Sequence, residues 1–213
     1  MVKREINKMF SEMRLYEFRN VVFSFGQNLL WRRDVIKLSR GKLLDVATGP
    51  GIIPGIYKRD FSVGLDISLS MLKKGKRRAV LVLGDGEELP FKSDSFDTIT
   101  IAFGLRNIPN KEKALREFYR VLKCPGRLLI LEMKADLNFW DLPNLAYLTL
   151  MIFLSPIFGG SVKDYLYLFK SIIDFPDDNT LRDMLISVGF KRVRVKRFAF
   201  GPTRLFYAEK CWD

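Results

Sequence analysis

Residues 42–51, KLLDVATGPG, decide the fold, because an apolar run passes directly into a glycine-rich loop. The run KLLDVA, residues 42–47, is too short and too uniformly apolar for an amphipathic helix, and it is typical of a strand buried on both faces. Gly49 and Gly51 permit a tight turn and a close approach of the backbone to a ligand. The helix expected after Gly51 would present free amide groups at its N-terminus. The stretch therefore predicts a strand, a ligand-binding loop and a helix, in that order.

The same alternation of short apolar runs and helical stretches continues to residue 132. Four further strands are predicted at 61–66, 79–85, 96–103 and 126–132. Helices are expected between them, at 52–59, 68–78 and 110–123. One face of the last helix is apolar and carries Ala114, Leu115, Phe118, Val121 and Leu122. Strands that alternate with helices form parallel sheets, so the sequence predicts a doubly wound α/β domain.

The two ends of the chain depart from this alternation. Residues 190–198, FKRVRVKRF, alternate apolar and basic side chains, and a Gly-Pro turn at 201–202 separates them from TRLFYAEK at 203–210. These two segments are expected to form an antiparallel hairpin with one face in water. Residues 3–38 are expected to form one or two helices, whose apolar face carries Ile6, Met9, Phe10 and Met13.

Length and composition favour one globular domain without a metal centre. A chain of 213 residues, 48% hydrophobic and 28% charged, can bury one sizeable core. No apolar segment or cleavage site for secretion follows the charged N-terminus, so a cytoplasmic protein is expected. The sequence contains no histidine, and Cys124 and Cys211 lack metal-ligand spacing. Zinc sites, histidine-dependent triads and a disulfide framework are therefore not expected.

The net charge of +12 is compatible with a nucleic-acid partner, an anionic membrane surface or plain solubility. The basic excess lies largely at the two ends of the chain. The densest basic run, KKGKRR at 73–78, is interpreted as the solvated end of a helix rather than as a nucleic-acid patch. The absence of histidine and the near absence of glutamine, beside many lysines and arginines, favour a thermophilic source.

Three predicted strands carry an aspartate at or near their carboxyl ends, where an open α/β sheet binds its ligands. Asp45 beside the glycine loop would repel a pyrophosphate, but it suits a cofactor with an ammonium and a sulfonium, which is S-adenosylmethionine. Asp66 can accept hydrogen bonds from both ribose hydroxyls, and Asp85 can accept one from the adenine amine. A dinucleotide remains an alternative, because the loop glycines form a loose fingerprint. Each aspartate alone could also be a helix cap or a turn former.

Several segments carry a resemblance to a known family. They are LDVATGPG (44–51), GLDIS (64–68), GDGEELPF (84–91), FGLRN (103–107), GRLLILE (126–132) and YLYLFKSI (165–172). The chain is similar, over most of its length, to the ubiquinone/menaquinone biosynthesis C-methyltransferase family, within the class I methyltransferases that use S-adenosylmethionine. The resemblance implies a Rossmann-like sheet of five parallel strands plus a C-terminal antiparallel hairpin, with helices on both faces.

The resemblance also implies a single methyltransferase domain and assigns residues to its cofactor. Its expected parts are an N-terminal helical lid (1–40), a cofactor-binding core (41–132), a helical substrate cover (133–175), and a C-terminal helix and hairpin (176–213). Phe10 and Tyr16 of the lid could close over the site, although core packing would explain either one. The residues expected to bind the cofactor are Asp45, Ala47, Thr48, Gly49, Pro50, Gly51, Asp66, Ile67, Met71, Asp85, Gly86, Glu87, Ala102 and Phe103.

Arg106 and Asn107 follow the fourth strand, where the resemblance places the methyl end of the cofactor. The implied reaction is methyl transfer to a ring carbon of a reduced, prenylated quinone such as a demethylmenaquinol, leaving S-adenosylhomocysteine. A fixed guanidinium favours the phenolate that makes the ring carbon nucleophilic, so Arg106 is the expected stabiliser and Asn107 is expected to orient an oxygen. The alternative is that Arg106 pairs with an acidic neighbour and Asn107 caps the next helix. Tyr165, Tyr167, a carboxylate or water could each be the general base.

Residues 133–164 match the family loosely and are expected to shape the substrate pocket. Residues 142–162 carry no charge, and about 20 apolar residues suffice to span a bilayer. Proline, asparagine and glycine residues interrupt this run. A cover over the pocket that rests on the membrane surface beside the basic chain ends is therefore expected in place of a spanning helix.

Two other functions stay open at this point. One is methyl transfer to another small molecule or to RNA, but the fourth strand lacks the Asn-Pro-Pro-aromatic and Pro-Cys motifs that suit nucleic-acid bases, so no nucleic-acid partner is expected. The other is a non-catalytic protein that binds S-adenosylmethionine. The oligomeric state stays open, with a homodimer as the alternative to a monomer.

Overall fold

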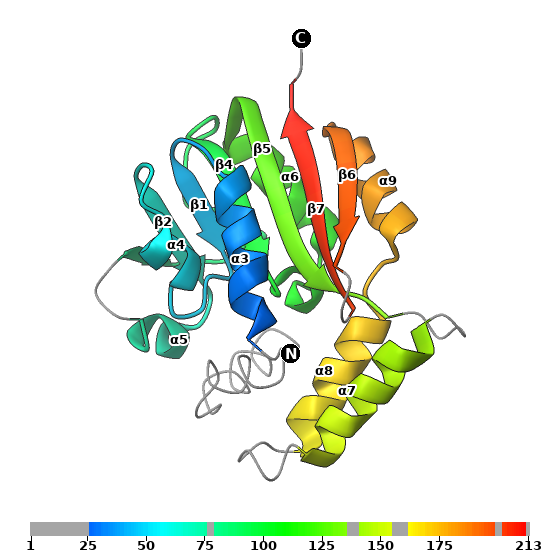
Figure 1. The fold of residues 1–213 in the computed structure, drawn as a ribbon. Helices are drawn as coiled ribbons and strands as arrows, with labels where there is room; N and C mark the ends of the chain where they lie inside the picture. Colours follow the sequence, from blue (N-terminus) through cyan, green and yellow to red (C-terminus); the bar gives the residue numbers. More distant parts are fainter. Residues whose placement is uncertain (1–25, 76–78, 136–140, 155–161, 199–201, 212–213) are drawn as a thin grey trace.

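The structure, a computed structural model, describes residues 26–75, 79–135, 141–154, 162–198 and 202–211. It is built on a seven-stranded sheet with the order β3-β2-β1-β4-β5-β7-β6 (Figure 1). The strands are β1 (Leu43–Val46), β2 (Ser62–Asp66), β3 (Val80–Leu83), β4 (Phe96–Ala102), β5 (Leu122–Met133), β6 (Lys191–Arg197) and β7 (Thr203–Lys210). Neighbours among β1 to β5 are parallel, and β7 runs antiparallel to both β5 and β6. The predicted sheet of five parallel strands with a C-terminal antiparallel pair is confirmed.

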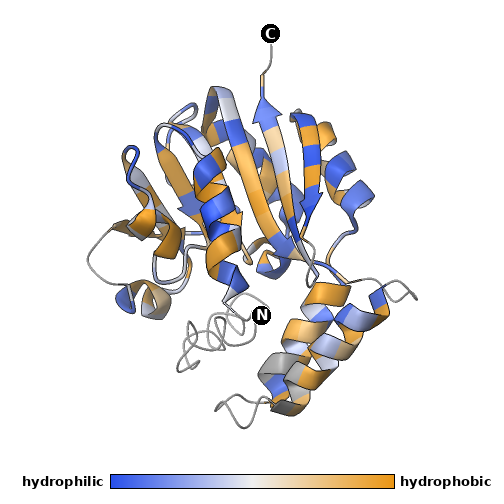
Figure 2. Cartoon of the chain, in the orientation of Figure 1, coloured by the Kyte–Doolittle hydropathy of each residue, from blue (hydrophilic) through white to orange (hydrophobic). Residues whose placement is uncertain are grey.

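The central strands are apolar because both of their faces are covered. All four residues of β1 are buried, and Leu128 to Leu131 of β5 are fully buried. Figure 2 shows hydrophobic residues concentrated along β1 and β5. Parallel pairing aligns Asp45 of β1 with Gly64 of β2 and with Thr100 of β4. The carboxyl ends of these strands consequently meet at one edge of the sheet.

Helices cover both faces of the sheet. They are α3 (Gln27–Leu38), α4 (Ile52–Ile56), α5 (Leu69–Lys73), the 3-10 helix η1 (Leu105–Asn107), α6 (Lys111–Val121), α7 (Leu142–Leu154), α8 (Val162–Ile173) and α9 (Asp178–Val188). One apolar cluster joins α3 and α4 to the sheet, and a second joins α6 and α9 to its other face. The apolar face predicted for α6 is confirmed, because Ala114, Leu115, Phe118 and Val121 are fully buried. The helix ends earlier than predicted, and Leu122 already belongs to β5.

Two other predicted helices are also shorter in the structure. The helix predicted at 52–59 is α4, which ends at Ile56, and the helix predicted at 68–78 is α5, which ends at Lys73. Lys73 and Lys74 are exposed, as a solvated helix end requires, and residues 76–78 lie outside the described part of the chain. The described part of the predicted N-terminal helices is α3. Ile6, Met9, Phe10, Met13 and Tyr16 lie outside the described residues.

The helices α7 and α8 form a pair that projects from the carboxyl edge of the sheet (Figure 1). They pack on each other through a small apolar cluster that includes Leu148 of α7 and Ile172 of α8. α7 contains no charged residue, and Leu150 and Phe153 are 51% and 76% exposed. No helix in the described ranges is both long and apolar enough to cross a membrane.

Two expectations about the C-terminal region are wrong. The hairpin does not keep one wet face throughout: β7 is almost wholly buried because it lies between β5 and β6, and the edge strand β6 carries the exposed basic residues. A disulfide joins Cys124 to Cys211, although none was expected from the sequence. Antiparallel pairing of β5 with β7 places Gly126 opposite Lys210 and so brings the two cysteines together across 87 positions of sequence.

Candidate functional site

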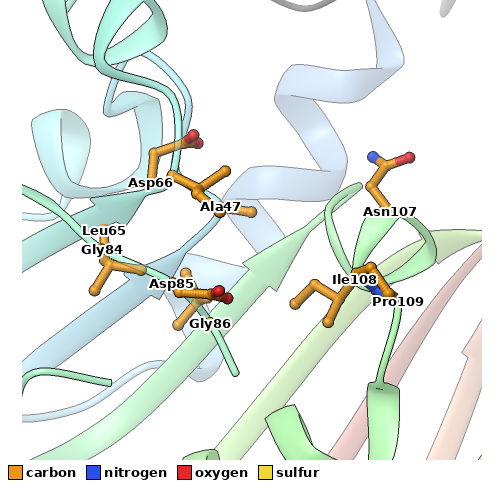
Figure 3. Close-up of a pocket in the computed structure, with 11 residues that line it drawn as sticks. Ala47, Leu65, Asp66, Gly84, Asp85, Gly86, Asn107, Ile108 and Pro109 are labelled. Atoms are coloured by element: carbon orange, nitrogen blue, oxygen red, sulfur yellow. The ribbon is translucent and has the colours of Figure 1, made fainter. Parts of the chain in front are cut away.

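A pocket lies at the carboxyl edge of the sheet, where the segments after β1, β2 and β3 meet the residues that follow η1 (Figure 3). Five of the residues predicted to bind the cofactor line it: Ala47, Asp66, Ile67, Asp85 and Gly86. Asn107, predicted for the acceptor, lines it as well, and Figure 3 shows its side chain across the pocket from the two aspartates. The other lining residues were not predicted from the sequence, and they are Val46, Leu65, Gly84, Ile108 and Pro109. Their only signal was adjacency to the strand ends.

The loop after β1 is held in shape by Asp45 from beneath. Asp45 is only 2% exposed, and its two carboxylate oxygens accept hydrogen bonds of 2.6 Å from the hydroxyls of Thr48 and Thr100. Burial raises the pKa of Asp45 from 3.8 to about 6, against the opposing effect of the two hydroxyls. Asp45 and Thr48 therefore shape the loop and do not line the pocket. Direct contact of either with a cofactor stays a prediction.

Left-handed backbone conformations make the loop turn away from the sheet. Ala47, Gly49 and Gly51 have φ angles of 51°, 59° and 76°. A side chain at residue 104 would clash with this loop, because a Cβ there would lie 2.5 Å from the Cβ of Ala47. Gly104 therefore lets the segments after β1 and β4 approach closely. Gly51 precedes the first residue of α4, which is the helix predicted to follow the loop, and Pro50 lies in the loop outside the pocket lining.

Asp66 connects the β1 loop to the end of β2. Its carboxylate accepts hydrogen bonds from the backbone amides of Gly49 at 2.7 Å and Ser68 at 2.8 Å. Burial raises the pKa of Asp66, and these backbone bonds oppose the rise. An ionised carboxylate offers about four lone-pair positions, so Asp66 can accept further hydrogen bonds from a ligand in the pocket.

The segment after β3 contributes Asp85 and Gly86 to the pocket but turns Glu87 away from it. Asp85 accepts a hydrogen bond of 2.9 Å from the backbone amide of Glu87. The buried Glu87 accepts one of 3.0 Å from the backbone amide of Asn110, the residue that caps α6. Glu87 thus connects the pocket floor to the start of α6, and its prediction as a cofactor ligand stays untested.

The remaining predicted cofactor residues surround the pocket without lining it. Met71 is 4% exposed, and its methyl lies 3.4 Å from where a Cβ of Gly49 would be. Ala102 and Phe103 pack in the cluster of α3, where the rings of Phe103 and Trp31 are 6.1 Å apart. Core packing accounts for all three in the described residues.

Arg106 forms a buried ion pair with Glu132 at the end of β5. The Nη1 of Arg106 lies 2.7 Å from Oε2 of Glu132, and the two side chains are 6% and 1% exposed. The Oε1 of Glu132 also accepts a hydrogen bond of 3.1 Å from the backbone amide of Arg106. The alternative in which Arg106 pairs with an acidic neighbour is therefore what the structure contains. Glu132 was missed as a partner, although it closes the fifth predicted strand as Asp66 and Asp85 close the second and third.

Asn107 is connected to the helical pair and does not cap the next helix. Its Oδ1 accepts a hydrogen bond of 3.1 Å from the hydroxyl of Tyr167 in α8, whereas Asn110 caps α6. Burial raises the pKa of Tyr167, with an opposing effect from the charge of Arg106. Tyr167 is therefore protonated at neutral pH and acts as a hydrogen-bond donor here. Tyr165 belongs to α8, and its side chain lies outside the described part of the structure.

Comparison of the sequence with family profiles assigns the chain to a protein family. The profile of the ubiE/COQ5 methyltransferase family matches residues 2–210. The chain belongs to the ubiE/COQ5 methyltransferase family. Two relatives are both named ubiquinone/menaquinone biosynthesis C-methyltransferase UbiE. The protein of Pseudomonas fluorescens is 36% identical, with 89% of this chain and 82% of the relative covered. That of Geotalea daltonii is 34% identical, with 97% and 96% covered.

Solved structures of methyltransferases share the fold of this family member. A SAM-dependent methyltransferase of Thermotoga maritima superposes with a TM-score of 0.63 at 20% identity, covering 91% of this chain and 98% of that one. An N-methyltransferase of Haemonchus contortus, solved with phosphomonomethylethanolamine and S-adenosylhomocysteine, gives a TM-score of 0.60 at 17% identity, covering 86% and 52%. The predictions of a methyltransferase, of S-adenosylmethionine as its cofactor and of a Rossmann-like sheet are confirmed.

The pocket fits this cofactor chemically. Asp66 and Asp85 offer carboxylate acceptors for hydroxyl and amine hydrogens, and Leu65, Ile67 and Ile108 offer apolar contact for an aromatic ring. Gly86 keeps the floor open, because a Cβ there would lie only 3.1 Å from Val46 and Ile108.

Proposed function

We propose that this family member methylates a ring carbon of a reduced, prenylated quinone of the demethylmenaquinol type. The relatives named UbiE support the substrate class. The observation that carries the proposal is the composition of the pocket, which has two acidic side chains on one side and, on the other, Asn107 hydrogen-bonded to the helical pair. One ligand can therefore be bound by the aspartates while a second approaches from the apolar helices.

The cofactor, when bound, supplies an electrophilic methyl group on its sulfonium. We assign Asp66 to the ribose hydroxyls and Asp85 to the adenine amine, with the backbone at Ala47, Ile67 and Gly86 around them. The other predicted residues are assigned to the shape of this site: Asp45, Thr48, Gly49, Pro50, Gly51, Met71, Glu87, Ala102 and Phe103. Most of them hold the loop after β1 or pack behind it.

The acceptor carbon becomes nucleophilic when a neighbouring hydroxyl loses its proton. We propose that Arg106 favours the phenolate electrostatically, and that Glu132 fixes its guanidinium while neutralising part of its field. Asn107 orients an acceptor oxygen through its amide, which Tyr167 holds in place. Burial raises the pKa of Tyr167, so its hydroxyl keeps its proton at neutral pH and cannot serve as the base in the resting protein. A water molecule or a carboxylate is the better general base, and Tyr165 stays a candidate.

The helical pair supports contact with a membrane that contains the prenyl tail. Exposed apolar residues lie on both of its helices: Leu142, Leu150, Phe153, Val162 and Leu166. An uncharged helix with exposed apolar side chains suits the boundary between lipid headgroups and acyl chains. We propose a cytoplasmic protein that meets the membrane peripherally through α7 and α8.

The experiment is methyl transfer from labelled S-adenosylmethionine to a reduced demethylmenaquinone analogue. Asp66→Ala should lose both cofactor affinity and activity, while Arg106→Ala should still bind the cofactor but transfer methyl slowly. Arg116→Ala is the matched control, because Arg116 forms an exposed ion pair with Glu112 on the outer side of α6. Cofactor binding by the intact protein without methylation of any quinol would refute the substrate and leave the family assignment intact.

A further inference from the structure

The N-terminal half of α3 lies at the carboxyl edge of the sheet, close to the site. α3 runs antiparallel to β1 and β4, so that its first turns reach the strand ends (Figure 1). Trp31 of α3 packs its ring 6.1 Å from that of Phe103, which directly follows β4. The turn of α3 that carries Trp31 and Arg32 therefore lies beside the segment that follows β4.

Arg32 is a buried cation whose guanidinium is incompletely hydrogen-bonded within the described residues. It is 7% exposed, and its Nε is buried with no hydrogen-bond partner among the residues that the structure describes. Arg106 and Arg204, whose side chains are 6% and 7% exposed, also have an Nε without a hydrogen-bond partner in that part of the chain, but each forms an ion pair at 2.7 Å, with Glu132 and Asp178 respectively. Burial of a charged donor without a hydrogen bond costs free energy. We therefore expect a ligand to supply the acceptor for Arg32.

Asp45 and Arg32 influence each other electrostatically, but no hydrogen bond joins the carboxylate of Asp45 to the guanidinium among the described residues. Burial raises the pKa of Asp45, and the positive charge of Arg32 is among the smaller effects that oppose this rise. The oxygens of Asp45 accept from the hydroxyls of Thr48 and Thr100. Asp45 thus has both of its oxygens engaged by hydroxyls, while the Nε of Arg32 keeps a donor to offer.

We propose that Arg32 binds the carboxylate of the amino-acid end of S-adenosylmethionine. That end carries an ammonium beside a carboxylate, which matches the opposite charges of Asp45 and Arg32. An arginine fork recognises a carboxylate through two parallel hydrogen bonds. The inference rests on the cofactor of the proposed function and on nothing about the methyl acceptor.

The test compares two ligands that differ only in this carboxylate. S-adenosylhomocysteine and its decarboxylated analogue, S-adenosyl-3-thiopropylamine, are titrated calorimetrically into the full chain and into Arg32→Met. The variant should bind S-adenosylhomocysteine on the order of 10- to 100-fold more weakly, the range for one charge-assisted hydrogen-bonded contact. Its affinity for the decarboxylated analogue should change less than about threefold. Arg33→Met, on the exposed side of α3, loses the same charge and should bind both ligands normally.

Equal weakening of both ligands in Arg32→Met would overturn the proposal, because Arg32 would then act only on the shape of the loop. Unchanged binding of both would overturn it as well. If Arg32→Met does not fold, Arg32→Lys retains the charge and must still lose affinity selectively for the ligand with the carboxylate. None of these titrations contains a quinol, so their result is independent of whether the quinol is the substrate.

Discussion

Replacing Glu132 with glutamine tests how the acceptor side of the pocket is held. Glu132→Gln keeps the shape of the side chain but leaves the guanidinium of Arg106 as a buried cation without its counter-ion. Both side chains are at least 94% buried, so solvent cannot screen the loss. Removing one partner of such a pair costs about 3–5 kcal/mol. We expect a decrease of that size in the free energy of unfolding, measured by urea denaturation at pH 7.

The comparison variant for this measurement is Glu112→Gln. Glu112 and Arg116 form an ion pair of 3.2 Å whose side chains are 60% and 68% exposed. Its loss should change the free energy of unfolding by no more than about 0.5 kcal/mol. A decrease in Glu132→Gln below about 1 kcal/mol, or one equal to that of Glu112→Gln, would refute the view that the buried pair holds η1. The double variant Arg106→Met with Glu132→Leu should recover much of the lost stability, because no unpaired charge remains.

Three further predictions follow from the loop after β1 and from the helical pair. The folded pKa of Asp45, about 6 against an ordinary 3.8, means that this carboxyl stabilises the fold below pH 4 and loses that contribution as pH rises through 6. Urea titrations should show Asp45→Asn gaining about 3 kcal/mol relative to the intact protein between pH 4 and pH 7. Gly104→Ala should cost about 1–3 kcal/mol of stability and weaken S-adenosylhomocysteine binding, because its methyl would lie 2.5 Å from that of Ala47. Phe153→Glu should reduce sedimentation of the protein with anionic lipid vesicles by several-fold, because it places a charge on an exposed apolar surface.

Each of these has a control and an outcome that contradicts it. A constant difference between Asp45→Asn and the intact protein across pH 4–7 would mean that the folded pKa of Asp45 is ordinary. Gly55→Ala meets no atom within 4 Å, so it should be neutral or stabilising, and an equal loss there would remove the steric argument. Ile186→Glu is the control for Phe153→Glu, because it places the same charge on an exposed residue of α9. If vesicle binding falls equally in both variants, the loss is due to the added charge and not to the position of Phe153.

The sequence was a good guide wherever a local pattern determines the outcome. Short apolar runs located the five parallel strands, because strands buried on both faces have few alternatives. The residues after the strands located the pocket, because parallel strands bring their carboxyl ends to one edge. Asp66 and Asp85 accordingly line it, while Asp45 lies beneath the loop.

Long-range pairings could not be predicted in the same way. The position of β7 between β5 and β6 depends on the order of strands in the sheet, and it also brings Cys124 to Cys211. The partner of Arg106 is Glu132 on β5, which lies 26 residues away in the sequence. The periodicity of a helix or strand cannot predict a contact over this separation. The thermophilic source and the lid around Phe10 and Tyr16 stay predictions.

The position of β7 has a consequence for synthesis on the ribosome. β5 and β6 leave the exit tunnel before residues 203–210, so both expose unpaired backbone edges until β7 inserts between them. β5 contains the apolar run Leu128 to Leu131, which makes its open edge prone to pairing with other nascent chains. The cofactor loops belong to strands that are already complete by then. The pocket residues therefore leave the tunnel well before the sheet is finished, whereas the open edges of β5 and β6 are covered only when residues 203–210 arrive.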